Sequence, residues 1–260
     1  MSSPAPIGRS LVTLASRPAA STRLVCFPSA GGGPSMFRQL ARELPADIEP
    51  VAVCLPGRES RLREHPARHL LALAAQITRE LVDTVRGPYL LFGHSMGAML
   101  AYEVCRWLQR TGRGDLPATL TVSACMGPDL ARSTKVIGES DWRLIERLAA
   151  LGGIPPEAAR DPDLMRLILP IIRADLEMVE VYRPRLGPAM NLELLVVVGE
   201  QDHVATPAQM TGWPPTALRS SLQVRPGGHF YLQDPVNREW LIDRFSEQAA
   251  RARLAAETAA

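Results

Sequence analysis

Six short apolar runs alternate with segments of helical period along most of this 260-residue chain. The runs are nearly continuous in apolar residues, as expected for parallel strands that are covered on both faces. Strands that alternate with helices predict an α/β fold, in which a doubly wound, mostly parallel central sheet is flanked by helices. The predicted strands are residues 23–28, 50–55, 89–94, 120–125, 194–199 and 222–225, and the predicted helices are residues 34–44, 69–85, 96–110 and 235–252.

The alternation stops between the fourth and fifth predicted strands, where the pattern indicates helices only. These helices are predicted at residues 140–151, 155–160 and 163–182. Ser140 is well placed to cap the first of them, because its hydroxyl can accept a hydrogen bond from the first turn. An insertion of about 60 residues has only a marginal core of its own. We therefore expect a single domain over residues 1–260, with a helical lid subdomain inserted at residues 129–187 over the carboxyl edge of the sheet.

Composition excludes several classes of protein. The chain has 29 basic against 27 acidic residues and a formal net charge of +2, whereas a nucleic-acid-binding protein usually carries a concentrated basic face. No segment approaches the roughly 18 apolar residues of a membrane span. Residues 1–20 hold no apolar run long enough for a secretory signal, so we predict a short, loosely ordered lead-in there. We expect a cytoplasmic protein that binds neither nucleic acid nor membrane, with a monomer as the default state.

The cysteines point to the same compartment. Cys26, Cys54, Cys105 and Cys125 form no C-x-x-C pair, and three of them lie inside apolar strand-like runs. Such cysteines are typical of buried, reduced thiols rather than of disulfides or metal ligands. We therefore expect neither a metal nor a cofactor.

The sharpest local signal is the sequence Gly-His-Ser-Met-Gly at residues 93–97. It follows an apolar strand and precedes a predicted helix, which is the context of a nucleophile elbow. In such an elbow the strand-to-helix turn forces the serine into a strained backbone conformation, and the glycines give the turn room to pass neighbouring strands. The serine hydroxyl is then presented at the sheet edge, at the positive end of a helix. Ser95 is therefore the predicted nucleophile.

A serine hydroxyl needs a base to become a good nucleophile. In α/β-hydrolases the chain order is serine, acid, then histidine. His229 follows the last predicted strand, and the two glycines before it let its loop fold back toward Ser95. His65 and His69 precede the serine and His94 lies within the elbow, so His229 is the predicted base.

The acid should end the strand that precedes this histidine. Residues 195–199 lead directly into the loop that holds Asp202, which is best placed to orient the imidazole and to stabilise its charged form. Glu200 is a competitor two residues earlier on the same loop, and Asp129 is another because it follows the fourth predicted strand. His203 is interpreted as a loop residue that could compete for contact with the acid.

An acyl-transfer site also needs donors for the negative oxygen of the tetrahedral intermediate. The backbone N–H of Met96, directly after the nucleophile, is one predicted donor. The second should come from the glycine-rich loop at residues 27–34, where Ala30 is the natural candidate. The same loop lacks the G-K-[ST] ending of a phosphate-binding loop, which disfavours a nucleotide site.

Four stretches together resemble the type II thioesterases of polyketide and non-ribosomal peptide assembly lines. They span most of the chain in the family's order, and the second and fourth are more specific to the family than the elbow itself. The stretches are Cys-Phe-Pro-Ser-Ala-Gly-Gly at 26–32, Leu-Pro-Gly-Arg-Glu-Ser-Arg at 55–61, Phe-Gly-His-Ser-Met-Gly-Ala at 92–98 and Pro-Gly-Gly-His-Phe-Tyr-Leu at 226–232.

This resemblance implies an α/β-hydrolase fold with Ser95 as nucleophile, His229 as base and Asp202 as acid, and with Ala30 and Met96 as oxyanion donors. It implies as substrate an acyl group that is thioester-linked to phosphopantetheine on an acyl or peptidyl carrier protein. The implied reaction is hydrolysis, which clears stalled or aberrant acyl chains from the assembly line.

Residues 123–129 depart from the family, which usually shows a basic Ser-Gly-Arg-Arg-Ala-Pro-like segment where this chain has Ser-Ala-Cys-Met-Gly-Pro-Asp. This region should border the lid and the acyl pocket. The resemblance therefore does not predict the acyl specificity of this chain or how a carrier docks there. Arg58 and Arg61 lie in a family-like stretch and either face the acidic carrier, form a structural ion pair or belong to a solvated loop. An esterase or acyltransferase acting on free small molecules, and a silent module that only binds a synthase, are the alternative functions.

Overall fold

The computed structural model describes residues 5–6, 8–130, 136–184 and 187–259. Within this part of the chain the strands form one eight-stranded sheet in the order β1-β2-β4-β3-β5-β6-β7-β8. Neighbouring strands from β4 through β3 to β8 run parallel, whereas β2 pairs antiparallel with both β1 and β4. The predicted α/β class is therefore confirmed. The strands are β1 Ala5–Pro6, β2 Leu11–Thr13, β3 Thr22–Phe27, β4 Ile48–Val53, β5 Tyr89–His94, β6 Thr119–Ser123, β7 Met190–Gly199 and β8 Ala217–Arg225.

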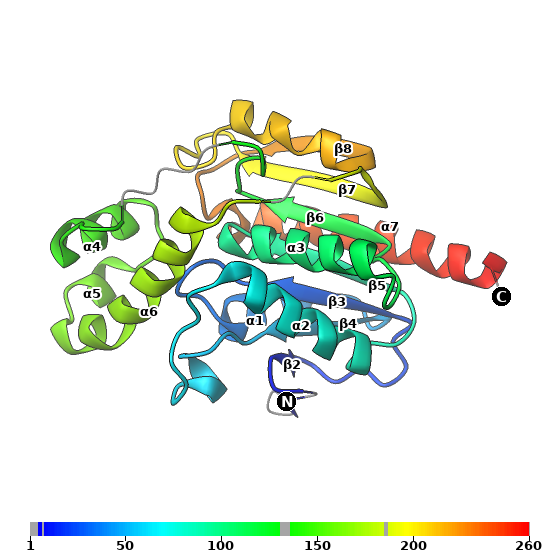
Figure 1. The fold of residues 1–260 in the computed structure, drawn as a ribbon, viewed down its shortest axis with the longest axis horizontal. Coiled ribbons are helices and arrows are strands. Elements are labelled where there is room, and N and C mark those ends of the chain that lie inside the picture. The colour runs from blue at the N-terminus through cyan, green and yellow to red at the C-terminus, as the bar shows by residue number, and fades with distance from the viewer. Residues whose placement is uncertain (1–4, 7, 131–135, 185–186, 260) are drawn as a thin grey trace.

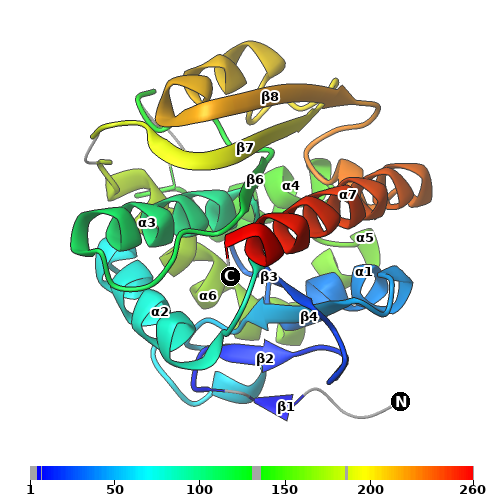
Figure 2. The ribbon, with the colours of Figure 1, turned by 90° about the vertical axis from the view of Figure 1, so that its right-hand side faces the viewer.

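Helices cover both faces of this sheet (Figure 2). One face is covered by α2 and α3 and the other by α1 and α7. The central strands β3, β5 and β6 are almost completely buried, which explains their continuous apolar sequence. The helices are α1 Arg38–Glu43, α2 Leu70–Thr84, α3 Met96–Thr111, α4 Asp141–Ala150, α5 Pro156–Ala159, α6 Pro162–Val181 and α7 Pro235–Ala259.

The amino-terminal region corrects one prediction. Residues 11–13 form the buried strand β2, which pairs with residues 51–53, so a loosely ordered lead-in was the wrong expectation for this segment. The backbone N–H groups of Ser10 and Leu11 also donate to Glu80 Oε1 on α2, at 2.6 and 2.9 Å. A three-residue strand is too short to show a periodic pattern, and its partners lie far away in the sequence.

Two further boundaries differ from the expected ones. Strand β8 begins at Ala217, five residues before the predicted start, and most of its residues are exposed. As an edge strand it needs no continuous apolar run. Its polar residues 219–221 therefore gave no strand signal in the sequence. The first predicted helix is divided into a 3-10 turn, η1 Pro34–Phe37, followed by α1.

Three helices, α4 to α6, lie between β6 and β7 in the chain and beyond the carboxyl ends of the strands (Figure 1). Ser140 caps α4 as expected, since its Oγ accepts a hydrogen bond from Arg143 N. Residues 136–184 hold a small apolar cluster of their own; its buried members are Val136, Leu144, Ile154, Met165, Leu169 and Ile172. We call residues 136–184 the helical insertion; residues 131–135 and 185–186 of the predicted lid lie outside the described part of the chain. Among the helices described, none is long and apolar enough to cross a membrane.

Candidate active site

The turn between β5 and α3 presents Ser95 in a conformation that few residues adopt. Its backbone has φ 55° and ψ −121°, in the region with positive φ that is strained for a residue with a Cβ. The turn is tightly packed, because a Cβ added at Gly97 would lie only 2.0 Å from the carbonyl oxygen of Phe27 on β3. The Ser95 N–H donates to Ser123 O on β6 at 2.8 Å, which ties the turn to the next strand. The sequence expectation of a strained elbow at Ser95 agrees with this geometry.

The structure brings Ser95, His229 and Asp202 into one hydrogen-bonded chain. Ser95 Oγ lies 3.0 Å from His229 Nε2, and His229 Nδ1 lies 2.9 Å from Asp202 Oδ2. A carboxylate can only accept hydrogen bonds, so Nδ1–H donates to Asp202 and Nε2 is left to accept from the Ser95 hydroxyl. The three residues lie in the loops that follow β5, β7 and β8. Both His229 and Asp202 are buried, at 7% and 2% exposure.

Hydrogen bonds from His229 and from two backbone N–H groups hold the Asp202 carboxylate in its charged form. Its Oδ1 accepts hydrogen bonds from the N–H groups of Val204 and Ala205 at 2.8 and 3.0 Å. Burial by itself raises the pKa of Asp202, but the hydrogen bond from His229, its charge and the two backbone bonds together bring that pKa below its ordinary value. Asp202 is therefore an anion at neutral pH and accepts the hydrogen bond from His229 Nδ1–H.

Neither competing acid bonds to this histidine in the described part of the chain. Glu200 is exposed, and its Oε2 accepts from the neighbouring Gln201 side chain. Asp129 is also exposed, and its carboxylate lies against the backbone of Gly212. His203 forms no hydrogen bond with Asp202, which is bonded to His229, Val204 and Ala205, and instead lines the cavity described next.

A cavity of about 290 Å³ opens at Ser95 and is lined mainly by apolar side chains from the sheet edge and from the helical insertion, with Arg147 and His203 among its polar members. Ala30 and Met96 border it beside Ser95. Their backbone N–H groups form no hydrogen bond with another described residue, so both are available to an oxygen bound next to Ser95. The other lining residues are Met99, Ala124, Cys125, Met126, Arg147, Leu148, Leu151, Leu176, Val179, His203, Val204 and Ala205.

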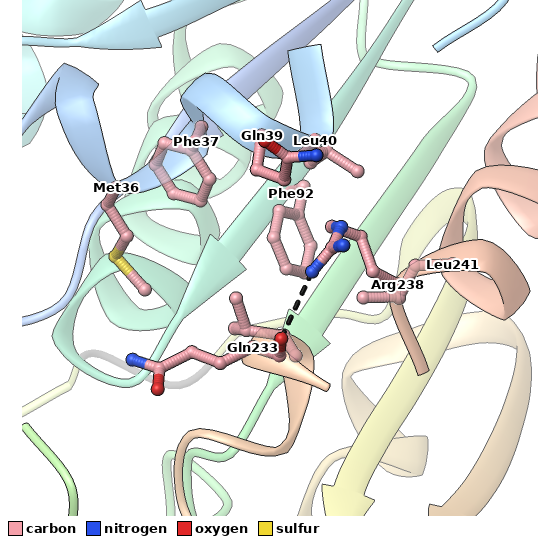
Figure 3. A pocket seen from close by; sticks show the side chains of 9 residues that line it. Met36, Phe37, Gln39, Leu40, Phe92, Gln233, Arg238 and Leu241 are labelled. Carbon is pink, nitrogen blue, oxygen red and sulfur yellow. Dashed lines mark hydrogen bonds between the residues drawn. The ribbon is translucent and has the colours of Figure 1, made fainter. Parts of the chain in front are cut away.

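A second cavity of about 290 Å³ lies beside α1 and α7 and holds none of the predicted site residues (Figure 3). Phe37, Leu40 and Phe92 form its apolar wall. Its one charged side chain, Arg238, is already engaged, because it pairs with Glu43 at 2.7 Å and donates to Gln233 O at 3.0 Å. The cavity at Ser95 is therefore the candidate active site.

The geometry agrees with what comparison with known proteins finds. A family profile described as the thioesterase domain matches residues 22–248. The chain belongs to the thioesterase family. Among solved structures, this thioesterase is similar to BorB, the type II thioesterase from the borrelidin biosynthetic cluster, with 32% identity and a TM-score of 0.83 over 92% of this chain and 97% of that one.

Two further relatives are described as thioesterases of biosynthesis. The type II thioesterase YbtT from the yersiniabactin NRPS/PKS pathway is 31% identical, with a TM-score of 0.83 over 94% of this chain and 99% of that one. A probable cadicidin biosynthesis thioesterase from Streptomyces griseus is 33% identical over 223 residues, which are 84% of this chain and 61% of that protein.

The thioesterase carries buried polar groups next to the site that the sequence analysis did not identify. His94 is fully buried, its Nδ1 lies 2.9 Å from Ser123 Oγ, and Ser123 Oγ lies 2.8 Å from the Tyr231 hydroxyl. Burial, with a smaller effect of the nearby His229, places the pKa of His94 well below its ordinary value. The only signal in the sequence was a histidine at an inward position of an otherwise apolar strand.

The two arginines of the family-like stretch are both buried, at 5% exposure each. Arg58 pairs with Asp175 on α6, and Arg61 pairs with Glu64 in the same loop. Since neither guanidinium lies on the surface, the structural alternative holds and the carrier-facing one is wrong. Asp175 itself carried no signal in the sequence, because it lies within a helix far along the chain.

Proposed function

We propose that this chain is a serine thioesterase that hydrolyses acyl-phosphopantetheine thioesters on carrier proteins and so removes stalled or aberrant acyl groups from a polyketide or non-ribosomal peptide assembly line. The observation that carries the proposal is the hydrogen-bonded chain from Ser95 through His229 to Asp202, which opens on an apolar cavity. Membership of the thioesterase family and similarity to BorB and YbtT support the substrate class.

The reaction follows from the contacts in two halves. Ser95 Oγ attacks the thioester carbonyl while His229 Nε2 takes its proton, and the carbonyl electrons move to an oxyanion that the N–H groups of Ala30 and Met96 stabilise. The tetrahedral intermediate collapses, the C–S bond breaks, and His229 returns the proton to the leaving thiolate. His229 then takes a proton from water, the resulting hydroxide attacks the acyl-serine, and the carboxylic acid leaves as Ser95 recovers its proton.

The helical insertion would act as the lid over the acyl chain. Leu148 on α4, Leu151 directly after α4 and Leu176 on α6 line the same cavity as Ser95. An acyl group bound there is surrounded by apolar surface, while its carbonyl stays at the polar sheet edge. The Cys125 and Met126 side chains line the same cavity, so the segment that departs from the family borders the proposed acyl site.

The proposed partner is a carrier protein that bears phosphopantetheine, and the proposed state is a monomer in the cytoplasm. All four cysteines are among the described residues, are buried and form no disulfide, which suits a reducing compartment. The proposal includes no metal and no cofactor, since a serine, a histidine, a carboxylate and backbone amides supply every step.

The test compares one acyl group on three leaving groups: a phosphopantetheinylated carrier protein, N-acetylcysteamine and p-nitrophenol. We expect kcat/KM for the carrier-bound thioester to exceed that for the N-acetylcysteamine thioester by at least about tenfold, because the carrier adds contacts that the small thiol lacks. Equal values for the two thioesters, with faster turnover of the aryl ester, would instead identify an esterase that acts on free small molecules.

A further inference from the structure

Beside the proposed active site lies an ion pair that is buried almost completely and joins two distant parts of the chain. Arg58, in the loop after β4, is 5% exposed, and Asp175, on α6 of the helical insertion, is 0% exposed. The pair is bidentate: Arg58 Nη1 lies 2.6 Å from Asp175 Oδ2, and Nη2 lies 2.9 Å from Oδ1. This fork geometry fixes the direction of both side chains as well as their distance.

Both members of the pair also hold the backbone of the glycine-rich loop that contains Ala30. Asp175 Oδ2 accepts a hydrogen bond from Gly31 N–H at 2.8 Å, and Arg58 Nη1 donates to Gly32 O at 3.1 Å. The loop is thus held at two consecutive residues, once through an N–H and once through a carbonyl.

Helix α6 packs against the same point of the loop. Gly31 has φ +75°, and a Cβ placed there would lie 2.5 Å from Cγ1 of Ile172, one turn before Asp175. The loop can therefore approach α6 this closely only with a glycine at position 31. One face of α6 supplies both the acceptor for Gly31 N–H and the side chain that packs over it.

Stability alone does not explain why two charges are buried here. The cost of removing both ions from water often cancels their attraction, and apolar residues of similar volume frequently replace a buried pair without loss of stability. What apolar residues cannot supply is an acceptor for the Gly31 amide and a donor for the Gly32 carbonyl. The specific contribution of the pair is therefore the conformation of the loop.

We infer that Arg58 and Asp175 are positioning residues that fix the Ala30 N–H in the direction of the oxyanion. The bond from Gly31 N–H to Asp175 fixes the plane of the Ala30–Gly31 peptide unit. The Ala30 N–H belongs to the preceding peptide unit, so with this plane fixed its direction depends only on the φ and ψ angles of Ala30. The pairing also neutralises the Asp175 carboxylate, which would otherwise oppose negative charge on a nearby oxygen. This inference rests on the proposed function of Ser95 and Ala30.

A consequence is that the helical insertion takes part in transition-state stabilisation. Because the acceptor for Gly31 N–H is carried by α6, the loop keeps its conformation only while α6 is packed against it. A displacement of α6 that separates Asp175 from Gly31 releases the Ala30 amide, even if Ser95, His229 and Asp202 stay in place.

The experiment measures kcat and KM for a p-nitrophenyl ester, which needs no carrier protein, together with inhibition by an alkyl boronic acid that forms a tetrahedral adduct with Ser95. The variants are Asp175→Asn, Arg58→Lys and the apolar double variant Arg58→Met/Asp175→Leu. Arg61→Lys is the matched control, because Arg61 is equally buried in the same loop but bonds to Glu64, Ser10 Oγ and Cys54 O instead of the glycine-rich loop. Circular dichroism and the melting temperature report folding.

We expect each variant at position 58 or 175 to lower kcat by about 10- to 100-fold and to leave KM within about threefold, since loss of one oxyanion donor outright costs 100- to 1,000-fold. Boronate affinity should fall by the same factor as kcat. The double variant should keep the wild-type melting temperature and still lose kcat, which a merely structural role of the pair would not produce. Arg61→Lys should keep kcat within about twofold.

Wild-type kcat and wild-type boronate affinity in the folded double variant would overturn the inference. A rise in KM with unchanged kcat would also overturn it, because the pair would then only shape the pocket. Failure of the carrier comparison above leaves these measurements valid, since they use an aryl ester. Retention of activity by Ser95→Ala would instead refute the proposed function itself.

Discussion

Two serine–histidine pairs lie side by side in this molecule, at nearly equal distances. Ser95 Oγ is 3.0 Å from His229 Nε2, and Ser123 Oγ is 2.9 Å from His94 Nδ1. The centroids of the two imidazole rings are 5.3 Å apart. The contact between serine and histidine therefore does not by itself distinguish a catalytic pair from a structural one.

The surroundings of the two pairs differ in three respects. His229 donates to the Asp202 carboxylate, whereas His94 Nε2 has no hydrogen-bond partner among the described residues. Ser95 borders the cavity beside two available amides, whereas Ser123 is fully buried and bonds to the Tyr231 hydroxyl. Ser95 lies on a strained turn and Ser123 within strand β6. A carboxylate, access to the cavity and available amides are what the chemistry proposed for the first pair requires.

Removal of the Ser95 hydroxyl should have the largest effect. Ser95→Ala should lower kcat/KM for an acyl-carrier thioester by about 10⁴-fold or more, because the covalent route is lost and only binding and the oxyanion donors remain. Its free energy of unfolding should change by less than about 1 kcal/mol, since among the described residues Ser95 Oγ bonds only to His229. Single-turnover kinetics and urea denaturation measure the two quantities. Residual activity within tenfold of wild type would exclude Ser95 as the nucleophile.

Removal of the charge on Asp202 should have the next largest effect. Asp202→Asn should lower kcat by about 10³-fold, because an amide no longer stabilises the imidazolium and can favour the wrong histidine tautomer. Asp129→Asn is the matched control, since Asp129 follows the neighbouring strand but makes no contact with His229, and it should stay within about twofold of wild type. Steady-state kinetics with an acyl-carrier thioester measure both, and the opposite order of effects would reassign the acid.

The first pair could be predicted from the sequence because local patterns mark it. Ser95 lies between an apolar strand and a helix, and Asp202 and His229 directly follow strands in the expected order. Parallel strands carry their following loops to one edge of the sheet, so chain order translates into proximity. The central strands β3, β5 and β6 were predicted for a related reason: being buried on both faces, they have a nearly continuous apolar sequence.

The second pair and the Arg58–Asp175 contact could not be predicted in this way. Arg58 and Asp175 are 117 residues apart, and nothing near either residue marks the other. His94 is the last residue of β5 and Ser123 is the last residue of β6. Their side chains are neighbours because the register of the two strands places His94 opposite Ser123. Strand β2 and the first half of β8 were not predicted, because they form by pairing with strands that are distant in the sequence and show no local periodicity.

Loss of the Ser123 hydroxyl should lower stability more than activity, the opposite of what is expected for Ser95→Ala. Ser123→Ala leaves His94 Nδ1 and the Tyr231 hydroxyl without this partner in a buried site, which should cost about 1–3 kcal/mol of unfolding free energy. The effect on kcat/KM should stay below about tenfold, because His229 keeps its contacts with Ser95 and Asp202. Urea denaturation and steady-state kinetics on Ser95→Ala and Ser123→Ala together test the distinction. Equal losses of activity in the two variants would remove it.

The buried histidine should also leave a signature in the dependence of stability on pH. The pKa of His94 in the folded protein is well below the ordinary value, while in the unfolded chain it is about 6.5. Below about pH 6.5 the unfolded chain therefore binds a proton that the folded protein excludes, and stability falls as pH falls. This group alone contributes up to about 1.4 kcal/mol per pH unit.

His94→Gln removes the titrating group, so its unfolding free energy should lack this contribution. The variant should be less stable than wild type at pH 8, and the difference between the two should shrink between pH 6.5 and pH 5. The charge of Asp202 does not disturb this window: the pKa of that carboxyl is lowered, so its contribution is complete above its unfolded pKa of about 3.9. Urea denaturation across this pH range measures the difference, and parallel curves for the two proteins would show that His94 accepts a proton in the folded state. In that case the second imidazole would be a titrating group beside the first, and the contrast between the two pairs would rest on the Asp202 carboxylate and on the access of Ser95 to the cavity.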